Sequence, residues 1–309
     1  TMLNKLLKWL LVFLLAVIAA VAALLFVPKD NGKTYRVKVA KNQGISSVSR
    51  KLADDDLIYN RHVLMLAAYA TGMHNQLKAG TYRMQAKASA WDVLQKLRSG
   101  RPDTVSVKIV EGMRFATMRK IINETESIQH DTAQWSDEKL MAEIAPDAMN
   151  PNPEGQFFPD SYEIDADSSD IQIYRLAYKT MQRELSAAWD ERQSGLPYKN
   201  PYELLIMASI IEKETGHPAD RAHVSSVFKN RLAIGMRLQT DPTVIYGMGA
   251  AYQGKIRKAD LRRDTPYNTY TRAGLTPTPI ALPGKAALEA TAHPSTEKYL
   301  YFVSRMDGT

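Results

Sequence analysis

The stretch IMASIIEKETG, residues 206–216, decides the fold because it places two carboxylates at the end of an almost wholly apolar run. From Leu204 to Ile211 only Ser209 is polar, and a helix that is apolar on nearly all faces is buried. Glu212 ends this run, and Glu214 follows two residues later. Either both are solvated charges at a helix end, or one is a buried acid with a chemical role.

The residues before this run carry the start signals of a helix. Asn200 is a good N-cap, Pro201 suits the first helical position, and Glu203 takes the capping-box position. We predict a core helix over residues 201–215. A lone glutamate in apolar surroundings has a raised pKa, because burial disfavours its charged form. Such a carboxyl, still protonated near neutral pH, can protonate a glycosidic oxygen.

Towards the N-terminus, short alternating strands are followed by helices with Val and Leu at helical spacing. Units this small cannot bury a core alone, so we predict a small α+β module over residues 35–104. Its strands are expected over 35–39 and 81–84, and its helices over 48–57, 59–71 and 90–97.

A larger mixed α+β domain is predicted over residues 105–309, so the fold class is α+β. It begins with a strand over 105–110 and a helix over 113–122. Glycine and two prolines favour an ordered loop over 153–162. Further helices are predicted over 171–194, 222–232 and 285–292, and a last strand over 298–303 precedes a turn signal at Asp307–Gly308.

The N-terminus carries an uninterrupted apolar run, WLLVFLLAVIAAVAALLFV, over residues 9–27. At about 1.5 Å per residue it spans a hydrocarbon core of about 30 Å with little to spare. We predict a cytoplasmic segment 1–8, a single-pass membrane anchor 9–27 and a polar tether 28–34, with the body outside the cytoplasm. A cleaved signal peptide is the alternative, although the run continues past its small residues.

Composition narrows the functional classes. The net charge is +7 and the pI about 9.3, so anionic partners such as nucleic acid, lipid headgroups or cell-wall polymer are favoured. The chain has no cysteine, which excludes disulfides, thiolate metal sites and cysteine nucleophiles. Nucleotide-binding glycine motifs, HExxH and GxSxG are absent. The basic residues are not gathered in one surface strip with interleaved aromatic residues, so we expect no nucleic-acid partner. Because the histidines form no metal-ligand cluster and the nucleotide motifs are absent, we also expect no metal and no cofactor.

The segments after the acidic pair are rich in neutral polar and aromatic residues. They read RLQTDPTVIYGMG over 237–249 and TPYNTYTRAGLTPTPI over 265–280. Such side chains suit sugars, because hydroxyl and N-acetyl groups take directional hydrogen bonds and pyranose faces stack on rings.

Four blocks of this sequence resemble signature blocks of the YceG-like (MltG) family of endolytic murein transglycosylases. In chain order they are PEGQFFPDSY, ASIIEKET, RLQTDPTVIYG and PYNTYTRAGLTPTPI, which is also the order of the family's blocks. The resemblance covers nearly the whole chain and implies that the module at 35–104 is LysM-like. It also implies a membrane-anchored lyase that cleaves the β-1,4 bond between N-acetylmuramic acid and N-acetylglucosamine. The products would carry 1,6-anhydromuramyl ends.

The family implies a role for each matched position. Glu212 matches the single catalytic acid/base, and Glu214 points roughly 200° away around the helix, which favours a structural role. For Asp241 the alternative to a binding role is a cap of the local turn, and for the tyrosines the alternative is packing in the core. The expected substrate-binding positions are Gln239, Thr240, Asp241, Tyr246, Tyr267, Asn268 and Tyr270, and the expected supporting positions are Glu214, Glu154 and Asp160.

Two alternatives remain beside the lyase. A hydrolytic muramidase usually needs a second carboxylate, for which Asp241 is the fair candidate. A non-catalytic, membrane-tethered glycan-binding scaffold would not need Glu212. The expected partners are glycan strands of nascent peptidoglycan, the inner membrane and, by resemblance, peptidoglycan synthases and transpeptidases. The family usually continues into a short histidine-containing tail that is absent here, so we expect the natural chain to extend further.

Overall fold

The computed structural model describes residues 2–302. The chain forms two compact units, Thr1–Val105 with Ile164–Ser168, and Ser106–Glu163 with Ser169–Thr309. The first boundary lies one residue from the predicted one. The segment 164–168 was predicted in the second unit but joins the first, because the backbone N–H of Ala166 donates to the carbonyl of Asp103 at 2.8 Å.

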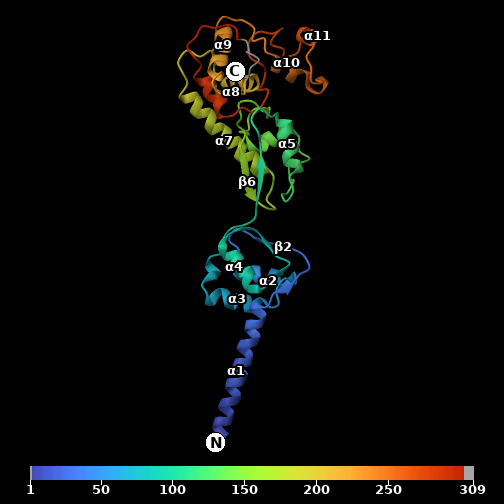
Figure 1. The fold of residues 1–309 in the computed structure, drawn as a ribbon, viewed down its shortest axis with the longest axis vertical. Helices are drawn as coiled ribbons and strands as arrows, with labels where there is room; N and C mark the ends of the chain where they lie inside the picture. Colours follow the sequence, from blue (N-terminus) through green and yellow to red (C-terminus); the bar gives the residue numbers. More distant parts are fainter. Residues whose placement is uncertain (1, 303–309) are drawn as a thin grey trace. The chain divides into compact units, whose positions relative to one another are not determined.

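The first unit begins with α1, Met2–Phe26 (Figure 1). Residues Asn4–Phe26 form a helix long and apolar enough to cross a membrane, and none of its most apolar window is buried. This range starts before the predicted span 9–27, because the helix continues through the two lysines that precede the apolar run.

The predicted tether over residues 28–34 is wrong for its first part. The strand β1, Lys29–Asp30, pairs antiparallel with β4, Lys87–Ala88. The backbone N–H of Asn31 donates to the carbonyl of Ala86 at 2.8 Å. The Lys29 ammonium also pairs with the Asp56 carboxylate. These polar residues have partners on the folded module, so the connection from α1 is structured.

The module folds around two antiparallel strands with two helices between them in sequence. Its strand β2, Tyr35–Val39, pairs with β3, Gly80–Met84, in the register Tyr35↔Met84 to Val39↔Gly80. The Asn60 side chain caps α3, and Ser89 forms a capping box with Asp92 at the start of α4. The helices close to their predicted ranges are α2 (Ile45–Asp54), α3 (Arg61–Ala70) and α4 (Ala90–Ser99), and the short η1 (Met73–Asn75) was not predicted.

The second unit is mainly helical and is built around α8, Pro201–Glu214. The strands β5 (Thr104–Lys108) and β6 (Ser161–Asp165) pair with each other. The helices are α5 (Phe115–Glu124), α6 (Asp137–Ile144), α7 (Ile171–Asp190), α9 (Arg221–Ala233), α10 (Asp241–Met248), η2 (Gly249–Ala251), α11 (Lys258–Arg262) and α12 (Lys285–Ala292).

The opening stretch behaves as predicted. All residues from Leu204 to Ile211 are buried, and the Asn200 side chain accepts the N–H of Glu203 at 3.0 Å. The one polar residue of the run, Ser209, accepts the backbone N–H of Ile280 at 3.0 Å. The apolar helix therefore holds the segment that leads into α12.

The predicted strand over 298–303 is wrong as far as the structure describes it. Residues 298–302 form no strand. The carbonyls of Glu297 and Tyr299 accept hydrogen bonds from the side-chain amide of Asn230 rather than from a partner strand. Val303 and the turn signal Asp307–Gly308 lie outside the described residues.

Candidate active site

The carboxyl of Glu212 lies at the end of the buried helix α8, and its side chain is 6% exposed. Its Oε2 accepts the backbone N–H of Gly284 at 2.9 Å, just before α12. Its Oε1 accepts from Nη2 of Arg221 at 3.3 Å, at the start of α9. Three helices thus meet at this acid.

Burial raises the pKa of the Glu212 carboxyl, and the negative charge of Glu111 raises it further. The Gly284 N–H and the positive charges of Arg221 and Lys213 oppose this rise. The net direction is upward, so more of the carboxyl is protonated at a given pH than for an exposed glutamate.

Glu111 reaches this site from the loop between β5 and α5. A Cβ built on Gly284 would lie 2.0 Å from the Glu111 Oε1 and 2.4 Å from its Cδ, so a side chain at position 284 would displace this flexible carboxyl. The loop is held in place by two backbone bonds to Leu282. The N–H of Gly112 donates to the carbonyl of Leu282 at 2.9 Å, and the N–H of Leu282 donates to the carbonyl of Met113 at 2.7 Å.

Glu111, Arg221 and Gly284 were not predicted as site residues. Glu111 and Gly284 lie in segments remote in sequence from α8, Arg221 begins the next helix, and no spacing pattern links the three to Glu212. The negative charge of Glu111 raises the pKa of Glu212, whereas Asp241, the predicted second carboxylate, accepts a hydrogen bond from the Tyr270 hydroxyl at 2.6 Å.

Glu214 faces another group of residues, as its position on the helix predicts. Its carboxylate accepts a hydrogen bond from the Thr240 hydroxyl, and burial raises the pKa of Glu214. Thr240 is the buried N-cap residue of α10, and Gln239 before it is exposed with a φ of +51°, in the left-handed region. Non-glycine residues adopt this conformation uncommonly, and Asn42, Asp56, Ser127 and Asp167 also adopt it elsewhere in the chain, so the backbone of Gln239 does not by itself mark a site.

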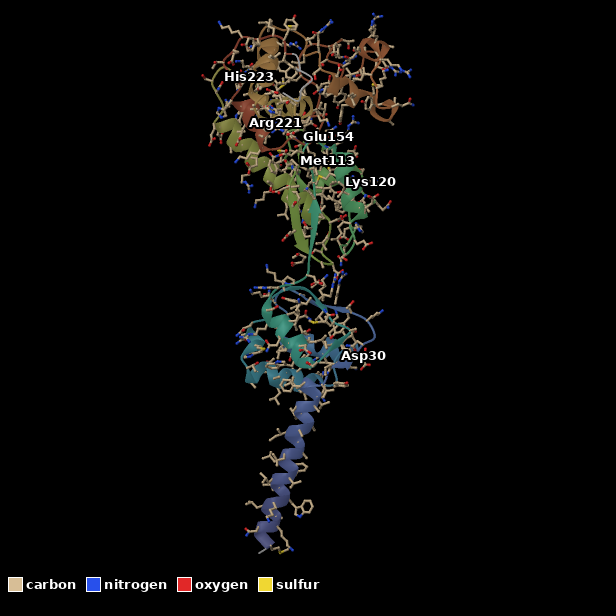
Figure 2. All side chains as sticks on the ribbon, in the orientation of Figure 1. Asp30, Met113, Lys120, Glu154, Arg221 and His223 are labelled. Atoms are coloured by element: carbon tan, nitrogen blue, oxygen red, sulfur yellow. The ribbon has the colours of Figure 1, made fainter. Side chains whose placement is uncertain are left out.

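Tyr246 and Tyr267, which were predicted as substrate-binding residues in two different blocks, lie together with their ring centroids 4.7 Å apart. The Tyr246 hydroxyl donates to Glu154 Oε2 at 3.1 Å, and Glu154 Oε1 accepts the N–H of Phe115 at 2.9 Å. The Arg114 guanidinium lies 4.8 Å from the Tyr246 ring. Figure 2 shows Met113 of this loop and Glu154 in the same region of the second unit.

A cavity of about 420 Å³ opens in this region and is lined by Glu154, Tyr246 and Phe115, among others. A second cavity of about 520 Å³ shares Phe115, Ala116 and Asp137 with the first. The two therefore form one groove along α5. Burial raises the pKa of Glu154 in its wall.

Of the predicted site residues, Tyr246 and Glu154 line this groove, whereas Glu212 and the other predicted positions are not among its lining residues. Asn268 is fully buried, and its amide donates to the carbonyls of Leu261 and Arg263 while its oxygen accepts the N–H of Tyr270. In this structure the amide shapes its own loop and is not available to an N-acetyl group, which corrects the predicted contact. Asp160 is exposed and accepts the N–H of Ser161 at 2.7 Å, so it supports the start of β6.

No metal centre is found in the part of the chain that the structure describes. Within residues 2–302 no three His, Asp or Glu side chains stand close enough together to hold a metal ion.

Comparisons with known proteins define the family. The model of the YceG-like family matches residues 37–309. An endolytic murein transglycosylase of Bacillus subtilis is 31% identical over 91% of this chain and 82% of its own length. One of Streptococcus pneumoniae is 26% identical over 91% of this chain, which spans 56% of that relative. The crystal structure of a putative yceG-like protein from Listeria monocytogenes has a TM-score of 0.54 and 28% identity, covering 89% of this chain and 95% of its own. The chain belongs to the YceG-like family.

Proposed function

We propose that this protein is a membrane-anchored endolytic lytic transglycosylase of peptidoglycan. It cleaves the β-1,4 bond between N-acetylmuramic acid and N-acetylglucosamine without water and leaves 1,6-anhydromuramyl ends. The observation that carries the proposal is the buried Glu212 carboxyl, whose pKa is raised at the meeting point of three helices. The names of the bacterial relatives support the reaction class.

One acid/base is sufficient for this reaction. Protonated Glu212 gives its proton to the glycosidic oxygen, and the bond from that oxygen to the muramyl C1 breaks. The muramyl C6 hydroxyl then bonds to C1, and the Glu212 carboxylate takes the hydroxyl proton. The acid returns to its starting form, and no water is consumed. The Gly284 N–H, 2.9 Å from Oε2, stabilises the intermediate carboxylate.

The groove beside Tyr246 supports action within a strand. Its two adjoining cavities share Phe115, Ala116 and Asp137, and in this proposal a glycan strand lies across both of them. Tyr246, Tyr267 and Asn152 offer the stacking faces and amide groups that sugars use. The helix α1 serves as the inner-membrane anchor in this proposal, with both units on the periplasmic side and nascent strands as substrate.

The product masses test the reaction. We expect purified peptidoglycan incubated with the protein to yield anhydromuramyl fragments of many lengths from the earliest time points. Mass spectrometry distinguishes them from hydrolytic products, which are heavier by one water and carry free reducing ends. Reducing ends would establish the muramidase alternative and would call for a test of its second carboxylate at Asp241, the predicted candidate, and at Glu111. Disaccharides alone at early times would contradict endolytic cleavage.

The pH dependence of kcat/KM tests the assignment of the acid. Because Glu212 must be protonated to begin the reaction, kcat/KM falls as the pH rises through its raised pKa. Glu111→Gln removes a charge that raises this pKa, so the alkaline limb should move to lower pH. Arg221→Gln removes a charge that lowers it, so the limb should move to higher pH, and Arg221→Lys should restore it. Shifts of both variants in one direction would contradict the assignment.

A further inference from the structure

The helix α3 exposes an apolar face although the module around it has a complete core. Leu66 is 60% exposed and Tyr69 54%, and Tyr59 before the helix is 47% exposed. The titratable residues of α3 are Arg61, His62 and Tyr69, and the helix has no Asp or Glu. We call Tyr59, Leu66 and Tyr69 the α3 face. Soluble surfaces rarely expose such contiguous apolar residues without a partner.

The α3 face adjoins the end of α1. In Figure 1, α3 lies where α1 enters the module, and the two helices are in contact. The Tyr59 hydroxyl donates to the carbonyl of Pro28 at 3.5 Å, and the Lys29 ammonium lies 5.5 Å from the Tyr59 ring. The face therefore continues directly from the residues that follow the apolar helix.

The length of α1 sets the level of the module. Residues 9–26 rise about 27 Å, close to the hydrocarbon thickness of about 30 Å. Leu25 already packs against the module core, and the Phe26 ring lies 5.5 Å from the Trp91 ring. β1 follows after two residues, so no free linker separates helix from module; Figure 2 labels Asp30 there. If α1 spans a bilayer, the module begins where the hydrocarbon ends.

We propose that the α3 face lies in the lipid interface, so that the module rests on the bilayer surface beside its own anchor. Tyrosines with one apolar and one polar end are enriched at this level, and an uncharged leucine gains by leaving water. The inference rests on α1 as a membrane anchor, which belongs to the proposed function. A glycan strand is the competing occupant of exposed aromatic residues.

Single-cysteine labelling of the full chain tests this inference, because the protein has no cysteine of its own. A fluorophore is attached to Leu66→Cys in vesicles of phosphatidylethanolamine and phosphatidylglycerol, with a phospholipid nitroxide as quencher. Leu14→Cys in α1 reports the anchor. Lys41→Cys is the surface control. It lies just past Val39, which pairs with Gly80 at the opposite end of the β2–β3 pair from Tyr35. Gly80 at that end lies beside Pro102.

We expect the lipid nitroxide to quench the labels at positions 66 and 14 severalfold more than the label at 41, with a blue-shifted emission at 66. Quenching at 14 without quenching at 66 would overturn the inference and leave the anchor intact. No quenching at 14 would overturn both. A response of position 66 to added glycan fragments, but not to lipid nitroxide, would assign the face to a glycan. All three substitutions replace exposed side chains, and thermal unfolding would verify that each variant folds.

Discussion

Glu212→Gln should lower the rate of formation of anhydromuramyl ends by a factor of about 10²–10⁴. The glutamine keeps the size of the side chain, and its amide oxygen can still accept the Gly284 N–H. It cannot donate a proton to the glycosidic oxygen, nor accept one from the C6 hydroxyl. The loss should therefore appear in kcat, and thermal unfolding should change little.

Two other buried carboxyls provide matched controls, because burial raises the pKa of each. Glu214→Gln changes the same helix two residues on, where the carboxylate accepts from Thr240. Glu154→Gln changes the groove wall beside Tyr246. Both variants should retain most of the activity. A loss in either one as large as that of Glu212→Gln, with normal unfolding, would transfer the acid/base role to that residue.

Gly155→Ala should lower the free energy of unfolding by about 2–5 kcal/mol. Gly155 has a φ of +78°, which costs an alanine about 1–2 kcal/mol. A Cβ there would also lie 2.2 Å from Cβ of Pro279 and 3.2 Å from the carbonyl oxygen of Ala281. A proline ring and a backbone carbonyl cannot turn aside as a flexible side chain can. Denaturant unfolding of the full chain measures the loss.

Gly195→Ala is the matched control for this prediction. Gly195 has a φ of +75°, but a Cβ there meets nothing within 4 Å. This variant should lose only about 1–2 kcal/mol, the cost of the left-handed backbone alone. Equal losses in the two variants would mean that the close approach to Pro279 contributes nothing to stability.

Much of the second unit could be read from local patterns. The apolar run, the Asn200 cap and Pro201 predicted α8 to within one residue, because a helix end depends on adjacent residues. The same patterns predicted α12 and the chief helices of the module. The strand predicted over 298–303 failed because alternation alone does not supply a partner strand.

The surroundings of each residue could not be read in this way. Residues 28–34 are polar and contain a glycine, which is typical of a tether, yet Lys29 and Asn31 find partners on the module. Asn268 lies in a segment suited to sugars, but its amide is used by its own loop. Polar side chains bind whichever groups the fold brings near, and their identity alone does not distinguish a ligand from a backbone carbonyl.

The sequence by itself determined that a carboxylate ends a buried helix, because apolar periodicity and capping act over neighbouring residues. By resemblance it also predicts that this glutamate is the catalytic acid, which stays a prediction. Only the tertiary structure decided which charges act on that carboxylate. Glu111, Arg221 and Gly284 come from three separate segments, and charges act through space rather than along the chain. Their convergence on Glu212 follows from the packing of α9, α12 and the β5–α5 loop around α8.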